Sequence, residues 1–301
     1  MSDDVLEFAK YQGTGNDFVM LLDLDDERPL DPVRVAALCD RRTGVGADGV
    51  IRVVRSDVEG ASFFMDYANA DGTTAEMCGN GIRCVGVLLH DRRLIDGAAV
   101  DVLTRAGLKH LALHPGPDGR MRVTVAMGMP RFTRAAIPMR GPAWETFLAQ
   151  PFDIGGGLTM TASAVSMGNP HLVVFVGADP STVHVGHVGP VLERHELFPE
   201  HTNIEFVYVH DGLVHARVWE RGSGETMACG SGACAAAVAA NEAGLVPAHT
   251  TVRFPGGDLE VERRDDGEVL LTGDAVLVFE GRLDARTLDA QTLDAQTFDA
   301  R

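Results

Sequence analysis

One repeated pattern constrains the fold of this 301-residue chain more than any other feature of its sequence. Cys78-Gly-Asn-Gly81 in the first half corresponds to Cys229-Gly-Ser-Gly232 in the second, and Gly15-Asn16 corresponds to Gly168-Asn169. The members of both pairs lie about 150 residues apart, and self-similarity at a nearly constant spacing is typical of a duplicated structural unit. We therefore predict two related domains in tandem.

Most of each half has the pattern of β-strands. Runs of β-branched or alternating apolar residues lie at 121–126, 171–176, 204–209 and 213–219. Each half also contains one helix that is apolar on all sides, at about 80–90 and 231–240, and such a helix belongs inside its domain. The sequence therefore predicts an α/β (α+β) fold of two pseudo-symmetric domains, each with strands wrapped around a central helix.

Turn signals and composition suggest where the domains end. The strand pattern gives way to a proline-containing turn after residue 128, so we predict an N-terminal domain at 1–128 and a C-terminal domain at 129–272. A last strand near 273–282 is expected to join the first domain. Residues 283–301 repeat a five-residue unit whose period fits neither helix nor strand, and we interpret them as a solvated tail.

Charge and composition argue against several classes of partner. The formal net charge is −17 at pH 7, and such a surface repels nucleic-acid phosphates and anionic lipids, so we predict neither as a partner. No apolar run reaches the roughly 18 residues that a membrane span needs. The N-terminus is acidic and no apolar signal-peptide core follows it, so a cytoplasmic location is expected.

The sequence also argues against cofactors and metals. Its two lysines, Lys10 and Lys109, lie outside any phosphate-binding loop, so pyridoxal phosphate is not expected. No G-x-G-x-x-G follows a strand and no P-loop is present, which disfavours dinucleotides and ATP. The five cysteines include no C-x2-C pair, so neither a metal site nor a disulfide framework is predicted.

Cys78 and Cys229 carry the strongest chemical signal. Each precedes Gly-x-Gly and a helix, so its thiol faces unpaired backbone N–H groups and the positive end of the helix dipole. This setting lowers the pKa of a thiol and also binds a carboxylate. One thiolate can then remove an α-proton while the other thiol delivers a proton to the opposite face. The pair predicts cofactor-independent epimerisation of an amino acid in a cleft between the domains.

Two other interpretations of these cysteines remain open. A free cysteine is often a small buried hydrophobe, which is how we interpret Cys39, Cys84 and Cys234. Two low-pKa thiols that face one cleft also suit a redox sensor, which would form a disulfide and would exchange no substrate proton. The duplicated glycine setting favours the catalytic interpretation for Cys78 and Cys229.

Polar residues near the cysteine motifs are candidates for substrate binding. Asn69 and Glu220 each lie nine residues before a cysteine, so we expect them to occupy related positions. Glu220 can bind an ammonium group, Arg221 can bind a carboxylate, and His171 can adjust thiol protonation. A surface ion pair and a structural histidine are the alternatives. Further candidates, which could instead cap turns, are Asn16, Asn169 and Asn203.

These motifs resemble those of the diaminopimelate epimerase family over about residues 7 to 282. The segments that carry the resemblance are Gly13-Thr-Gly-Asn-Asp-Phe18, Asn69-Ala-Asp-Gly72, Cys78 to Cys84, Gly168 to His171, Thr202 to Phe206, and Glu220 to Cys234. The resemblance implies two β-barrel-like sheets, each around a central helix, with the active site in the cleft between the domains. It also implies interconversion of LL- and meso-2,6-diaminopimelate for lysine and peptidoglycan synthesis, and a homodimer.

The resemblance further implies roles for individual residues. Cys78 and Cys229 would be the acid/base pair, and His171 and Glu220 would tune their pKa values. The substrate-binding residues would be Asn16, Asn69, Gly79, Asn80, Asn169, Asn203, Glu220, Arg221, Gly230 and Ser231. One position departs from the family pattern. Some relatives carry a substrate-binding Gln where this chain has Gly49, so we expect no such contact here.

Two related activities are the nearest alternatives. A proline or hydroxyproline racemase would also use two cysteines, but its ring substrate would leave Arg221 and the asparagines without a role. A related isomerase that uses a carboxylate instead is disfavoured because both cysteine motifs are intact.

Overall fold

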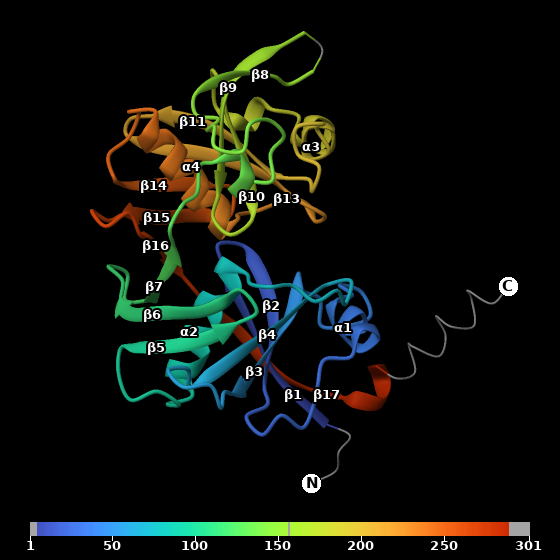
Figure 1. Cartoon of the computed structure of the whole chain (residues 1–301). Helices are drawn as coiled ribbons and strands as arrows, with labels where there is room; N and C mark the ends of the chain where they lie inside the picture. Colours follow the sequence, from blue (N-terminus) through green and yellow to red (C-terminus); the bar gives the residue numbers. More distant parts are fainter. Residues whose placement is uncertain (1–4, 156, 289–301) are drawn as a thin grey trace, which may run out of the picture. The chain divides into compact units, whose positions relative to one another are not determined.

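The structure is a computed structural model that describes residues 5–155 and 157–288. The chain divides into two compact units (Figure 1). The N-terminal unit contains the chain up to Val123 and the segment from Asp274 onward, and the C-terminal unit contains Thr124–Gly273. Each unit has its own hydrophobic core. Across the described residues, no helix is both long enough and apolar enough to cross a membrane.

The N-terminal unit consists of strands around a helix. Its strands are β1 (Val5–Gly13), β2 (Asn16–Leu22), β3 (Gly49–Arg55), β4 (Phe63–Asn69), β5 (Ala99–Thr104), β6 (Gly107–Pro115) and β17 (Val276–Asp284), and β7 (Met121–Gly128) contains the boundary. Its helices are α1 (Pro32–Cys39) and α2 (Gly79–Asp91). The strands pair in the order β17–β1–β2–β3–β4–β5–β6, with β2–β3 and β4–β5 parallel and the other pairs antiparallel.

The C-terminal unit is built in the same way. Its strands are β8 (Gln150–Asp153), β9 (Thr159–Ser166), β10 (Pro170–Phe175), β11 (Asn203–His210), β12 (Leu213–Glu220), β13 (Gly224–Thr226), β14 (His249–Phe254), β15 (Gly257–Arg263) and β16 (Val269–Asp274). Its helices are α3 (Val185–Glu193), α4 (Gly230–Glu242) and the 3-10 turns η1 (Arg134–Ala136) and η2 (Pro180–Thr182). The strands pair β8–β9–β10–β11–β12–β14–β15–β16, with β10–β11 and β12–β14 parallel, and β13 also pairs with β12.

The two units repeat one topology, which confirms the predicted duplication. In each unit, two antiparallel strands are followed by a helix and then by a strand that pairs in parallel with the second of them. The same order of elements then occurs once more, starting from that parallel strand. Strands β2, β3, β4 and β5 therefore correspond to β10, β11, β12 and β14. The registers also agree, because Phe18 pairs with Gly49 where His171 pairs with Asn203. This correspondence allows each residue of one unit to be compared with its counterpart in the other.

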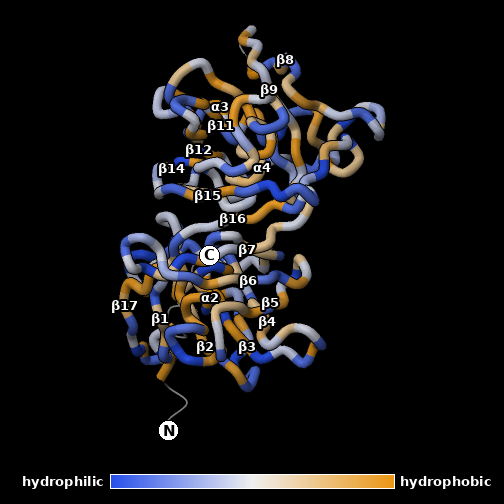
Figure 2. The backbone as a smooth tube through the Cα atoms, turned by 90° about the vertical axis from the view of Figure 1, so that its left-hand side faces the viewer, coloured by the Kyte–Doolittle hydropathy of each residue, from blue (hydrophilic) through white to orange (hydrophobic). Residues whose placement is uncertain are grey.

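The predicted central helices are α2 and α4, and Figure 1 shows each of them among the strands of its own unit. Nearly every residue of both helices is buried, and hydrophobic residues also follow the strands beside α2 (Figure 2). A helix that is enclosed on all sides cannot use solvent to satisfy the backbone groups at its ends. Each helix instead begins at a cysteine N-cap, Cys78 for α2 and Cys229 for α4.

The sequence pattern did not predict α1 or α3. The start of α1 does carry a recognisable signal, because Pro32 is its first residue and the Asp31 carboxylate caps the N–H groups of Val33 and Arg34 at 3.0 and 2.9 Å. Helix α3 has Pro190 in its interior, which hides it from a pattern-based prediction.

The interpretation of residues 283–301 as a solvated tail is wrong for its first six residues. Strand β17 pairs with β1 as far as Asp284, opposite Val5. Leu288 is only 2% exposed and packs in the same hydrophobic cluster as Leu283. The five-residue period places an apolar side chain at both positions, and the fold buries them against α1 and β2. The remainder of the repeat lies outside the described residues.

Candidate active site

In the N-terminal unit, three predicted site residues meet at the start of α2. The Cys78 thiol lies 3.6 Å from the side-chain oxygen of Asn16 and accepts a hydrogen bond from the Gly81 N–H at 3.4 Å. The Asn80 amide donates to the same Asn16 oxygen at 3.3 Å. Gly79 is the first residue of the helix, directly after the cysteine. Strand β2 and helix α2 therefore bring Asn16, Cys78 and Asn80 into one cluster.

A partly exposed ionic group holds Asn16 in place. The Asn16 amide donates to the Asp48 carboxylate at 2.6 Å, and Arg41 bridges Asp48 to Asp17. Lys10, which is buried, lies 2.6 Å from Asp17 and also donates to the carbonyl of Gly46. One of the two lysines thus serves to organise the start of β2. Sequence reasoning missed Asp48, although it lies inside the Gly-rich segment that precedes β3.

This ionic group predicts a loss of stability in acid. Burial alone raises the pKa of Asp17, but hydrogen bonds from Arg41 and Lys10 outweigh burial and lower it from 3.8 to about 2. A depressed carboxylate pKa stabilises the fold above pH 4, and that contribution is lost as the pH falls from 4 to 2. Chemical unfolding at pH 5 and pH 3 should show a larger loss in the wild type than in Asp17→Asn. Equal losses in the two proteins would contradict this role.

Asn69, also predicted to bind substrate, is held by other groups. Its side-chain oxygen accepts from the Tyr67 hydroxyl at 2.8 Å, and its amide donates to Thr73 at 3.0 Å. Asn69 lies opposite Gly49 in the β3–β4 pair. A Cβ on Gly49 would come within 2.6 Å of the Tyr67 ring and of the Ala68 carbonyl oxygen. The ring of Tyr67 therefore fills the space beside Gly49.

In the C-terminal unit, the corresponding cluster forms at the start of α4. The Cys229 thiol accepts from the Gly232 N–H at 3.4 Å and lies 3.5 Å from the Ser231 hydroxyl. The Asn169 amide donates to the same hydroxyl at 3.3 Å. Gly230 is the first residue of this helix. Ser231 takes the place of Asn80, but Asn169 donates its amide to Ser231 whereas Asn16 accepts through its oxygen from Asn80.

The expected lowering of the thiol pKa is wrong for Cys229. Burial raises the pKa of this thiol well above its ordinary value, and the carboxyl groups of Glu220 and Glu205 raise it further. Hydrogen bonds from Ser231 and Gly232 oppose these effects without outweighing them. The helix dipole is a modest influence, whereas burial away from water strongly disfavours a thiolate. Cys229 is therefore held as a neutral thiol.

Glu220, Asn203 and Arg221 are further predicted site residues in the C-terminal unit. Burial raises the pKa of Glu220, and hydrogen bonds from Thr226 and Cys229 oppose that rise. Asn203 is turned toward the backbone: its amide donates to the Pro170 carbonyl at 2.8 Å, and its oxygen accepts from the Arg221 N–H at 2.9 Å. The Arg221 side chain is exposed and donates to the Glu200 carbonyl at 3.1 Å. Asn203 therefore anchors the segment that carries Arg221.

His171 belongs to a buried pair that the sequence did not reveal. Its Nδ1 lies 2.7 Å from the Glu205 carboxyl and its Nε2 lies 2.9 Å from the Asn169 oxygen. Both His171 and Glu205 are completely buried. The signal that could have found Glu205 is a single acidic residue inside an otherwise apolar strand, Ile204–Val209. Both imidazole nitrogens have partners, and neither partner is Cys229.

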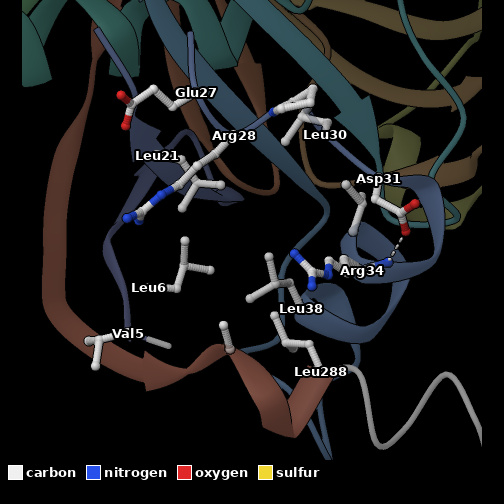
Figure 3. A pocket seen from close by; sticks show the side chains of 13 residues that line it. Val5, Leu6, Leu21, Glu27, Arg28, Leu30, Asp31, Arg34, Leu38 and Leu288 are labelled. Atoms are coloured by element: carbon white, nitrogen blue, oxygen red, sulfur yellow. Dashed lines mark hydrogen bonds between the residues drawn. The ribbon is translucent and has the colours of Figure 1, made fainter. Parts of the chain in front are cut away.

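The N-terminal unit has a cavity that none of the predicted site residues lines. It has a volume of about 690 Å³ and lies between β1, α1 and the end of β17. Figure 3 shows Leu6, Leu21, Leu38 and Leu288 around it, with Arg28 and Arg34 also on its walls. Among the described residues, no cluster of three or more His, Cys, Asp or Glu side chains is arranged to hold a metal ion.

Comparison with solved structures defines the class of fold. A hydroxyproline epimerase from Agrobacterium vitis matches with a TM-score of 0.68 and 14% identity, over 94% of each chain. A phenazine biosynthesis protein of the PhzF family from Bacillus anthracis matches with a TM-score of 0.67 and 18% identity, over 94% of this chain and 99% of that one. The chain has the mixed α/β fold that these proteins share.

Sequence comparison then gives the family. The family model for diaminopimelate epimerase matches residues 8–133 and 163–278. A diaminopimelate epimerase from Desulforudis audaxviator is 46% identical over 280 residues, which cover 92% of this chain and 99% of the relative. The chain belongs to the diaminopimelate epimerase family, as its motifs indicated.

Proposed function

We propose that this chain interconverts LL- and meso-2,6-diaminopimelate without a cofactor, with Cys78 and Cys229 as acid and base. The observation that carries the proposal is the thiol at the N-cap of a buried helix, present once in each unit. The substrate follows from family membership, because a relative that is 46% identical over 92% of this chain is a diaminopimelate epimerase.

The chemistry requires one thiolate and one thiol at the start of each turnover. The thiolate takes the proton from the α-carbon, and the electron pair left behind is delocalised into the neighbouring carboxylate. The other thiol then gives its proton to the opposite face of the carbon, so the configuration inverts. The two cysteines end the turnover with their protonation states exchanged. We assign Cys229 as the proton donor in the first turnover, because burial holds it as a thiol.

Charge that develops on the substrate carboxylate needs hydrogen-bond donors. The first backbone N–H groups of a helix have no partners within the helix and point toward its N-terminus. We assign this role to the amides of Gly79 and Asn80 in α2 and of Gly230 and Ser231 in α4. Donors fixed in place before the reaction stabilise an oxyanion without reorganisation.

The remaining predicted residues would hold the ends of the substrate. We assign substrate contacts to Asn16, Asn69, Asn169, Glu220 and Arg221. Asn203 is assigned to the support of Arg221, because its polar atoms bond to the backbone. A homodimer is a further part of the proposal, carried by the family resemblance.

The test is proton exchange at the substrate α-carbon. Reduced protein is incubated with LL-diaminopimelate in deuterated water without any added cofactor, and the products are followed by NMR. We expect deuterium at one α-carbon together with the meso isomer. Exchange with proline or hydroxyproline instead would replace the substrate and keep the mechanism. Absence of exchange with all three substrates would overturn the proposed function.

A further inference from the structure

Two buried residues of the C-terminal unit differ from their counterparts in the N-terminal unit. Phe18 in β2 occupies the position of His171 in β10, and Ile51 in β3 occupies the position of Glu205 in β11, because the strand registers match. Contacts with the central helices agree with this. A Cβ on Gly81 would lie 2.6 Å from Ile51, and a Cβ on Gly232 would lie 2.6 Å from Glu205.

The fold itself therefore does not require a polar pair at this place. The N-terminal unit fills the space beneath its cysteine-bearing helix with an aromatic ring and an aliphatic side chain. The C-terminal unit buries an imidazole and a carboxyl there, and one Glu205 oxygen, Oε2, has no hydrogen-bond partner among the described residues. Burial of such a pair is usually no more stabilising than apolar packing of similar volume. A role other than stability is needed to explain the pair.

Hydrogen bonds connect His171 to Cys229 through Asn169 and Ser231. Asn169 directs its oxygen to His171 and its amide to Ser231, whose hydroxyl lies 3.5 Å from the Cys229 thiol. An amide oxygen only accepts hydrogen bonds, so Nε2 of His171 must carry a hydrogen. Glu205 then shares one further proton with Nδ1. The ring is thereby fixed with a donor toward Asn169.

We propose that Glu205 and His171 are positioning residues that fix the orientation of the Asn169 amide beside Cys229. This inference rests on the proposed function, in which Asn169 contacts the substrate. Without the pair, the amide could rotate by 180° and present its oxygen where its N–H groups now lie. The counterpart in the N-terminal unit is different, since Asn16 is oriented by Asp48.

The test gives the C-terminal unit the two apolar side chains that the N-terminal unit has at these positions. In His171→Phe/Glu205→Ile, the polar pair becomes the apolar pair already present beneath α2. We expect an unfolding midpoint close to that of the wild type and a KM for diaminopimelate raised about ten- to hundredfold, the range for a lost hydrogen bond to a charged group. Glu205→Gln is the matched control, because its amide donates to Nδ1 and keeps the hydrogen on Nε2. Its KM should stay within about threefold of the wild-type value.

A double-mutant cycle with Asn169→Ala tests whether the pair acts through Asn169. We expect the apolar pair to leave KM unchanged in the Asn169→Ala background. Full additivity, or a normal KM in the folded apolar variant, would overturn the proposal. Nitrogen-15 NMR of His171 in the wild type needs no variant, and a bare Nε2 would also overturn it. If the wild type fails to exchange the substrate proton, the proposed function fails, while this spectrum still tests the pair.

Discussion

Replacement of either Cys78 or Cys229 by serine is expected to lower kcat for epimerisation by about 10²- to 10⁴-fold, the usual contribution of a general acid or base. A serine hydroxyl is far less acidic than a thiol, so it cannot supply the basic form near neutral pH. The fold should be retained, because a hydroxyl can accept the capping hydrogen bond that each sulfur accepts from the third residue of its helix.

The matched controls are Cys84→Ala and Cys234→Ala. These cysteines are completely buried within the same two helices, so their loss removes a small apolar group and no acid or base. We expect a moderate loss of stability and near-normal kcat for both. Activity is followed by appearance of the meso isomer, and folding by circular dichroism. Near-wild-type turnover in Cys78→Ser or Cys229→Ser would exclude that cysteine as an essential acid or base.

Replacement of Arg52 by methionine is expected to lower the free energy of unfolding by about 3–5 kcal/mol, because it leaves the buried carboxylate of Asp23 without its counter-charge and that of Asp66 with Arg105 alone. Arg52 is buried in β3 and contacts Asp66 through Nε and Nη2 at 3.1 and 3.0 Å. Its Nη1 contacts Asp23 at 2.9 Å and Asp26 at 2.5 Å. The side chains of Asp23 and Asp66 are 9% and 10% exposed, so water cannot replace the lost partner.

The control for this prediction is an ion pair of similar geometry at the surface. Arg253 contacts Asp258 through two nitrogens at 2.8 and 2.7 Å, with both side chains nearly half exposed. Arg253→Met should lower the free energy of unfolding far less than Arg52→Met does, because solvent screens such pairs. Urea unfolding of both variants at neutral pH gives the comparison. Equal losses would show that burial is not what makes Arg52 important.

The sequence by itself determined the architecture and the chemical class. The repeat of Cys-Gly-x-Gly predicted duplication, and the apolar segments at 80–90 and 231–240 predicted two central helices, which the structure contains as α2 and α4. The position of a cysteine before each helix also followed from the sequence. These features are local, because helix starts, glycine spacing and hydrophobic periodicity depend on residues that are close together in the sequence.

Only the tertiary structure decided what surrounds the two thiols. The pKa of Cys229 is raised because strands distant in the sequence enclose it and bring two carboxyl groups near, whereas its local motif predicted the opposite. The pair of His171 and Glu205 and the contact between Gly49 and the Tyr67 ring depend on strand register. Desolvation and close packing come from residues that meet only after folding, so local sequence patterns cannot specify them.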